Sequence, residues 1–238
     1  INLLVNVFVA LSTASSIIVA RNFGAKDNDG ISKAVHTSIG VSIVSGIILS
    51  IIGIYFARPL MLLLNCPYEV LGKAVLYMRL YFAGILAMMV YNFGSAILRA
   101  IGDTKRPLYI LLITGLINVV LNLVFVIFFK MDVAGVAIAT TISQFISALM
   151  IVLCLVKTDD VYKLELKKIR IHKKYLIEIL LLGIPASIQS VASSLSNMLI
   201  EASVNSVGAA AMAGCAAAGS LENFVFVAID SFQHSITT

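Results

Sequence analysis

Two asparagines, Asn118 and Asn122, lie four residues apart in the otherwise apolar stretch from Gly115 to Phe125. A spacing of four places both carboxamides on one face of a helix, one turn apart. An amide oxygen can accept a hydrogen bond or coordinate a cation, and the amide nitrogen donates. Because polar groups are costly against lipid, we expect this pair to face either a neighbouring helix or a hydrated cavity.

Three carboxylates also fall within predicted apolar helices, namely Glu201, Glu222 and Asp230. An unpaired charge at the centre of a bilayer costs at least about 2.5–3.5 kcal/mol, so such an acid needs a partner or has a function. Glu222 and Asp230 are eight residues apart and therefore lie roughly on one helix face. A carboxylate there could carry a proton, bind Na⁺ or pair with a cationic substrate; the alternative is a structural hydrogen bond.

Polar residues recur along one face of five predicted helices. Such stripes either join helices through hydrogen bonds, worth roughly 0.6–2 kcal/mol each, or line a hydrated cavity. Five striped helices favour the cavity, since a few contacts would be enough to hold helices together. The side chains predicted to line the cavity are Tyr81, Met88, Asn92, Ser190, Ser194 and Asn197.

The elements that must position these groups are long apolar blocks. Of the 238 residues, 60% are hydrophobic and 12% are charged, and the mean hydropathy is +1.03. A soluble domain carries about twice that charge, and the uncharged blocks exceed the roughly 20 residues that cross a bilayer as a helix. We predict an all-α polytopic membrane protein with about seven transmembrane helices, at 2–20, 35–57, 74–98, 108–129, 133–156, 179–206 and 209–237.

Basic residues predict the orientation of these helices. Thirteen of the 17 Lys and Arg fall in the connections 21–33, 99–106 and 157–174, which follow the first, third and fifth predicted helices. The positive-inside rule places these connections on the cytoplasmic side of a bacterial plasma (inner) membrane. The net charge of +5 therefore reflects topology, and no nucleic-acid partner is predicted.

The segment 157–178 is too charged to span a bilayer, and it alternates apolar with basic residues. This pattern is typical of a strip that lies along the inner membrane surface and touches anionic headgroups, so membrane lipids are predicted partners. The segment divides the chain into a first lobe at 1–156, an amphipathic cytoplasmic linker at 157–178, and the start of a second lobe at 179–238.

No motif of an enzyme occurs in the sequence. A His-Glu-x-x-His run, a nucleophile elbow and a phosphate-cradling glycine loop are all absent, and the three cysteines have no metal-ligand spacing. We therefore predict a protein that is not an enzyme, with no catalytic residue, no metal site and no cofactor. Without an ATP-binding loop, any transport must be driven by an ion gradient or by a partner protein.

Several motifs, taken in order along the chain, resemble those of multidrug and toxic compound extrusion (MATE) transporters, in particular a bacterial DinF-like branch. Any one of them is weak, but the ordered set covers nearly the whole chain and is specific. The matching segments are Ala20–Asp27, Leu98–Pro107, the pair Asn118–Asn122 and Val133–Thr140, and Gly183–Pro185.

The resemblance implies a fold of twelve helices in two lobes, of which this chain, truncated at both ends, would supply helices two to eight. It also implies a cation site in the first lobe, where Asn118, Asn122 and Thr140 match family positions. Asn122 stands where many members have Asp, so it can coordinate Na⁺ but cannot carry a proton. Glu222 resembles a Glu in related bacterial members. The predicted cation-binding residues are Asn118, Asn122, Thr140, Glu222 and Asp230.

The predicted function is that of a secondary-active multidrug exporter. It would antiport amphipathic, often cationic small molecules against Na⁺ or H⁺ by alternating access, as a monomer. One alternative is a flippase of lipid-linked sugars from the same superfamily, which would need cationic residues in its cavity to meet pyrophosphate. Another is a membrane scaffold without transport, which the polar stripes disfavour.

Overall fold

The computed structural model describes residues 2–63 and 68–207, together with five positions beyond residue 207. A π-helical segment, Val124–Phe128, extends the fourth helix, and a 3-10 turn, Leu166–Lys168, lies between the last two. The described residues contain no strand, which confirms the all-α prediction. The long helices are α1 (Asn2–Gly24), α2 (Asn28–Leu63), α3 (Tyr68–Ala100), α4 (Lys105–Leu123), α5 (Asp132–Lys157) and α6 (Lys173–Val207).

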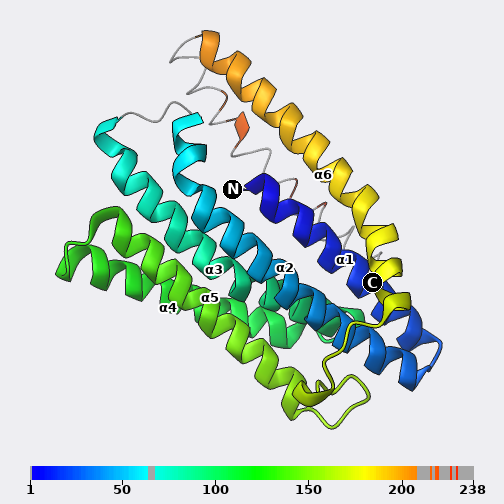
Figure 1. Cartoon of the computed structure of the whole chain (residues 1–238). Helices are drawn as coiled ribbons and strands as arrows, with labels where there is room; N and C mark the ends of the chain where they lie inside the picture. The colour runs from blue at the N-terminus through cyan, green and yellow to red at the C-terminus, as the bar shows by residue number, and fades with distance from the viewer. Residues whose placement is uncertain are drawn as a thin grey trace.

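The helices lie side by side in a bundle, with α4 and α5 at one edge and α6 beside α1 at the other (Figure 1). Helix α3 is central, because it packs on α1, α2 and α5. Six of the described helical stretches are long and apolar enough to cross a membrane. They correspond to the first six predicted spans, and the seventh, at 209–237, lies outside the described ranges.

Three helices begin six or seven residues earlier than hydropathy predicts, among them α3, which begins at Tyr68 rather than at 74. Helix α2 begins at Asn28 rather than at 35, and the carboxylate of Asp27 accepts the N–H of Gly30 at 3.0 Å. A side chain that satisfies a free N–H of the first turn allows a helix to continue beyond its apolar part. Helix α6 begins at Lys173 rather than at 179, so the last six residues of the predicted linker are helical.

Two clusters of buried side chains hold the bundle together. The larger one contains Ile18 from α1, Val35 from α2, and Phe93 and Ile151 from α3 and α5. The smaller one joins α2 to α3 around Phe82. There the Phe82 ring lies so close to Gly53 of α2 that a Cβ on this glycine would be 1.9 Å from the ring. This packing fixes α3 against α2 and leaves another face of α3 toward α5.

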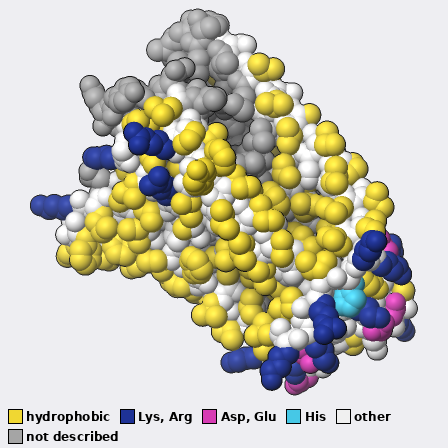
Figure 2. Space-filling model, viewed as in Figure 1, with side chains coloured by type: hydrophobic (Ala, Val, Ile, Leu, Met, Phe, Trp, Pro, Cys, Tyr) yellow, Lys and Arg dark blue, Asp and Glu magenta, His cyan; other side chains and the backbone are white. Residues whose placement is uncertain are grey.

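The surface view shows a broad hydrophobic band between two zones of Lys and Arg (Figure 2). On the face shown, the acidic and histidine side chains gather in only one of these zones. A belt of apolar side chains between charged ends is the arrangement that a bilayer requires of a helical bundle. Polar side chains within this belt lie at the depth of the lipid tails, where they need a protein partner, water or a ligand.

Candidate cation and substrate site

A cavity of about 430 Å³ lies between α3, α4 and α5, within the apolar belt. Its lining combines the amides of Asn92, Asn118 and Gln144 with hydroxyls from all three helices and with the apolar side chains of Met88 and Leu111. The lining residues that matter here are Met88, Tyr91, Asn92, Asn118, Thr140 and Ser143. The structure thus brings together four of the predicted site residues, and Asn122 follows one turn beyond Asn118.

Three polar side chains on α4 and α5 form a directional chain of hydrogen bonds, which we call the amide relay. Asn122 Nδ2 donates to Asn118 Oδ1 at 3.0 Å, and Asn118 Nδ2 lies 3.5 Å from Thr140 Oγ1. The Thr140 hydroxyl in turn donates to the carbonyl oxygen of Val136 at 2.9 Å. Every donor in the relay thus points away from Asn122 toward Val136.

One acceptor is left over at the start of the relay. Asn122 Oδ1 is buried and has no hydrogen-bond partner among the described residues. A buried polar atom without a partner costs about 1–3 kcal/mol, so most native structures avoid one. A carbonyl-type oxygen in this position is a suitable ligand for a hard cation such as Na⁺, or an acceptor for water.

The serine and threonine hydroxyls around the cavity donate their protons to carbonyl oxygens of their own helices. Thr114 donates to Ile110 O at 2.8 Å, and Ser143 donates to Ala139 O at 2.9 Å. Ser147 donates likewise within α5. With its proton engaged, each hydroxyl has only lone pairs left to offer. These hydroxyls therefore present acceptors to the cavity, which attract cations and the N–H or O–H groups of a ligand.

The other predicted cavity residues do not join this cavity. Tyr81 stacks on Tyr77, with ring centroids 6.4 Å apart, beside the smaller core cluster. Ser190 and Ser194 lie on α6, where Ser194 Oγ is 3.5 Å from Asn6 of α1, and Asn197 is exposed. Glu222 and Asp230 lie outside the described residues, as does the side chain of Glu201.

Several polar contacts join α1 to α6 along their length. The guanidinium of Arg21 pairs with the carboxylate of Glu178 near one end. Further along, the Ser187 hydroxyl lies 2.7 Å from Gly183 O of its own helix and 2.9 Å from Val7 O of α1. The serine stripe of α6 therefore reaches α1, while the amide relay belongs to α4 and α5.

Sequence reasoning missed Tyr91 and Ser143 as lining residues. Tyr91 precedes Asn92, and its hydroxyl donates to Pro107 O at 3.2 Å, which ties α3 to the start of α4. Ser143 lies three residues after Thr140 and so shares its helix face. Extending the stripe of α5 from Thr140 by helical spacing would have found Ser143. No helical spacing predicts Tyr91 as a lining residue, because its position beside the cavity depends on how α4 packs against α3.

Comparison with known proteins identifies the family. The model of the MatE family matches residues 1–124, just over half of the 238 residues. The chain belongs to the MatE family. This confirms the predicted resemblance to MATE transporters, and the DinF-like branch stays a prediction.

Among curated MatE relatives, the "Probable multidrug resistance protein YoeA" of Bacillus subtilis is 28% identical over 94% of this chain. The "Probable multidrug resistance protein YpnP" of the same organism is 30% identical over 91% of the chain. A solved structure, "Crystal structure of MATE in the bent conformation", matches 89% of the chain with a TM-score of 0.81 and 25% identity. The chain spans about half the length of each, with 50%, 48% and 48% covered.

These findings confirm a multi-span protein of the bacterial inner membrane with the fold of a MATE transporter. Membership in a family of transporters, which bind small-molecule substrates, supports the prediction that the protein is not an enzyme. The orientation of the loops and the division into lobes stay predictions.

Proposed function

We propose that the full-length protein containing this chain is a secondary-active multidrug exporter. It antiports amphipathic, often cationic compounds against Na⁺ or H⁺ by alternating access between the two sides of the membrane. Residues 1–156 form one lobe, 157–178 a cytoplasmic linker, and 179–238 the start of the second lobe. The transporter works as a monomer, with its basic loops in the cytoplasm.

The amide relay carries this proposal. Asn122 Oδ1 has no partner among the described residues, and Asn118 and Thr140 lie within hydrogen-bonding reach along the same chain of contacts. A coupling cation would take its ligands from these oxygens. Because amides and hydroxyls do not titrate near neutral pH, the relay alone favours Na⁺ over H⁺. A proton-coupled cycle would need a carboxylate, for which Glu222 and Asp230 of the second lobe are the candidates.

The chemistry of the cavity supports cationic, amphipathic substrates. Its lining contains no Lys or Arg, and it combines hydroxyl and amide oxygens with Met88 and Tyr91. Methionine adapts to ligands of varied shape, and an aromatic face attracts organic cations. The same lining argues against a flippase of lipid-linked sugars, because pyrophosphate would find no positive partner there.

The test is drug accumulation in a bacterial host that lacks its own efflux pumps. Cells expressing the full-length protein should accumulate less ethidium and norfloxacin than cells with an empty vector. Glu222→Gln should weaken this difference at equal expression. Equal accumulation with and without the protein would disprove export of these compounds.

The coupling ion is tested in proteoliposomes with a Na⁺ or an H⁺ gradient imposed separately. Ethidium uptake driven by Na⁺ alone is the expected result from the relay. Uptake driven by H⁺ alone, and abolished by Glu222→Gln, would transfer the coupling role to the second lobe. Uptake that follows neither gradient would contradict antiport.

A further inference from the structure

The segment between α5 and α6 is fastened to α2 by two of its backbone N–H groups. The N–H of Glu165 donates to His36 Nε2 at 3.1 Å, and the N–H of His172 donates to Thr37 Oγ1 at 3.1 Å. His36 and Thr37 are consecutive in α2 and are buried, with 3% and 0% of their surface exposed. We call these two contacts the loop anchors, and residues 166–171 between them the basic loop.

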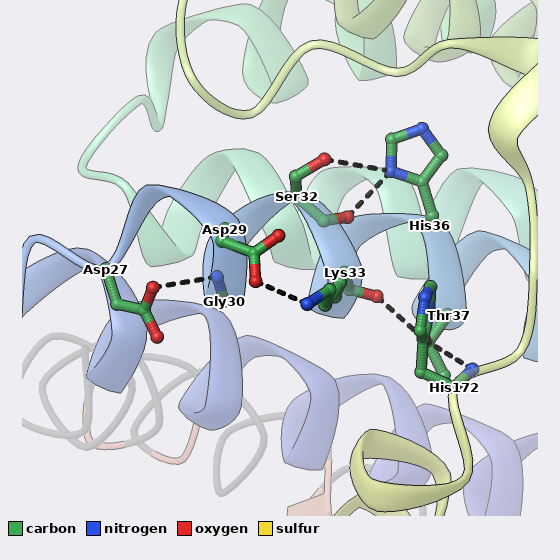
Figure 3. Close-up of polar contacts among 8 residues, drawn as sticks. All are labelled: Asp27, Asp29, Gly30, Ser32, Lys33, His36, Thr37 and His172. Carbon is green, nitrogen blue, oxygen red and sulfur yellow. Dashed lines mark hydrogen bonds and ion pairs between the residues drawn. The ribbon is translucent and has the colours of Figure 1, made fainter.

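The side chains of His36 and Thr37, which form the loop anchors, also make hydrogen bonds within α2. His36 Nδ1 lies 2.6 Å from the carbonyl oxygen of Ser32, so this nitrogen carries the proton and Nε2 is free to accept. The Thr37 hydroxyl donates to Lys33 O at 2.7 Å while its oxygen accepts from His172 (Figure 3). Because each polar side-chain atom of His36 and Thr37 has a hydrogen-bond partner, these contacts hold the basic loop against α2.

Apolar contacts also fix the basic loop. Just before it, Leu164 is buried in the larger core cluster, and Ile169 packs against the same cluster. A Cβ on Gly40 would lie 3.0 Å from Ile171, so the loop rests directly on α2. The basic side chains alternate with these apolar ones. The apolar side chains thus make the packing contacts of the loop, and the basic side chains remain available to bind a ligand.

A pocket of about 360 Å³ lies between the basic loop and the first turns of α2. This volume is within the range of small-molecule sites. Four cations line the pocket against one carboxylate, Asp29. The charged and hydroxyl groups that line it are Asp29, Ser32, Lys33, Lys167, Lys168 and Arg170.

Two of the four cations are not neutralised. Lys33 pairs with Asp29, and Lys168 pairs with Glu165 at 2.8 Å. Lys167 and Arg170 have no ion-pair partner within the part of the chain that the structure describes. An Arg fork binds two oxygens of a phosphate at once, and Lys adds a point charge. The excess of positive charge in a fixed pocket selects an anion and repels cationic substrates.

We propose that this pocket binds a phosphate group, with Arg170 and Lys167 as its main ligands. The group is presented either by the headgroup of an anionic phospholipid at the membrane surface or by a soluble phosphate compound. Ser32 and Lys33 of α2 line the same pocket, so a phosphate bound there would contact α2 as well as the basic loop and strengthen the link between them. The site shares no residue with the cavity between α3, α4 and α5.

The test compares two double variants of the full-length protein in which two cations are removed. Lys167→Gln with Arg170→Gln removes the unpaired cations of the pocket. Lys105→Gln with Lys157→Gln is the matched control, because both lysines are exposed and neither lines the pocket. Phosphatidylglycerol retention is measured by native mass spectrometry. Inorganic phosphate is titrated by the rise in melting temperature in phosphatidylcholine nanodiscs, against chloride at equal ionic strength.

The pocket variant should lose affinity for its phosphate source by about tenfold or more, since each cation near a membrane surface contributes about 1 kcal/mol. The control should change less than about threefold. Binding of phosphatidylglycerol alone assigns the site to a lipid headgroup, and a response to inorganic phosphate alone assigns it to a soluble compound. Arg170→Lys keeps the charge but loses the two-pronged guanidinium. Its affinity for phosphate should lie between those of the wild-type protein and the pocket variant.

Two results would overturn the proposal. One is that the wild-type protein responds to neither probe. The other is that both double variants lose affinity equally, because that outcome indicates diffuse surface charge without a defined pocket. The melting temperatures of the variants without phosphate check that each of them is folded.

Discussion

The amide relay and the loop anchors are both small polar networks that join separate parts of the chain, but they differ in how completely their groups are paired. At the anchors, every polar side-chain atom of His36 and Thr37 has a hydrogen-bond partner. In the relay, Asn122 Oδ1 has no partner among the described residues. A saturated network positions structure, whereas an unsaturated one leaves an atom for a ligand.

The two networks also differ in how much other structure surrounds them. The anchors lie where α2 is covered by core side chains and by the linker. Two of the three relay residues lie on α4, which packs mainly on α5 and keeps Leu112 and Leu116 more than half exposed. We therefore expect changes at the relay to alter ion coupling with little effect on stability. Changes at the anchors should do the reverse.

The largest effect is expected from Asn122→Leu. This change removes the unpaired oxygen together with one amide hydrogen bond, so Na⁺-driven uptake in proteoliposomes should fall by about a hundredfold, or roughly 2.7 kcal/mol. The melting temperature should change little, because the loss of a buried unsatisfied oxygen offsets the loss of the donor to Asn118 Oδ1. Asn122→Asp is the control: it keeps the oxygen, and uptake should survive and become dependent on pH. Normal uptake by the leucine variant would exclude the relay as the cation site.

Thr37→Val tests the other side of the comparison. The valine leaves the His172 N–H without its acceptor, at a cost of about 1–3 kcal/mol, so the melting temperature should fall clearly. Uptake per folded molecule should not change. Thr13→Val is the matched control, because Thr13 donates only to Val9 O of its own helix and should be nearly neutral. If Thr13→Val destabilises as much as Thr37→Val, the anchors have no special structural role.

Gly115→Leu should block the cavity without disturbing the backbone. A Cβ on Gly115 would meet no atom within 4 Å, and Gly115 lines the cavity. Uptake should fall by about tenfold, or about 1.4 kcal/mol. Gly72 in α3 is also helical, and a Cβ there would likewise meet no atom within 4 Å, but Gly72 does not line the cavity. The Gly72→Leu protein should therefore transport normally. An equal loss of uptake in both variants would show that a leucine on a helix surface impairs transport wherever it lies, which would contradict a role for the cavity.

Two adjacent threonines of α5 allow a finer comparison. Thr140 belongs to the relay, whereas Thr141 donates to Leu80 O of α3 at 3.0 Å and does not line the cavity. Thr140→Val should weaken apparent Na⁺ affinity by roughly three- to tenfold, as expected for one hydrogen bond or ligand oxygen. Thr141→Val should lower the melting temperature and leave Na⁺ affinity unchanged. The opposite pattern would reassign the two roles.

The smallest effect is expected at the Glu165 side chain. The Lys168 ammonium lowers the pKa of the Glu165 carboxyl. A lowered pKa means that the pair contributes stability at neutral pH and loses it as the pH falls through that value. Because the pair is exposed, Glu165→Gln should leave the melting temperature at pH 7 unchanged within error and only slightly flatten its fall in acid. A large loss at pH 7 would show that the side chain, and not the backbone N–H, holds the loop.

The sequence was sufficient to predict the spans and part of the site. Apolar blocks longer than a bilayer located six helices, and the four-residue spacing placed Asn118 and Asn122 on one face. The family resemblance added Thr140, which comes from another helix. The ends of α2 and α6 were missed because capping and charged turns, rather than hydropathy, decide where those helices begin.

The remaining features depend on contacts between residues far apart in the sequence. His36 accepts from a backbone N–H 129 positions away, and no local pattern encodes that partner. The separation of Ser194 from the α3–α5 cavity follows from how α6 packs on α1, where a Cβ on Gly183 would lie 2.5 Å from Leu11. A stripe of polar residues shows that a helix has a polar face, but not which helix that face meets.

The Ser187 hydroxyl has one proton and two acceptors within reach, Gly183 O on α6 and Val7 O on α1. If α6 moved away from α1, the proton would remain with Gly183, and Val7 O would keep the hydrogen bond of its own helix. Neither helix would then carry an orphaned donor. At Ser187, the contact between α1 and α6 can therefore separate and form again without leaving a polar group unpaired.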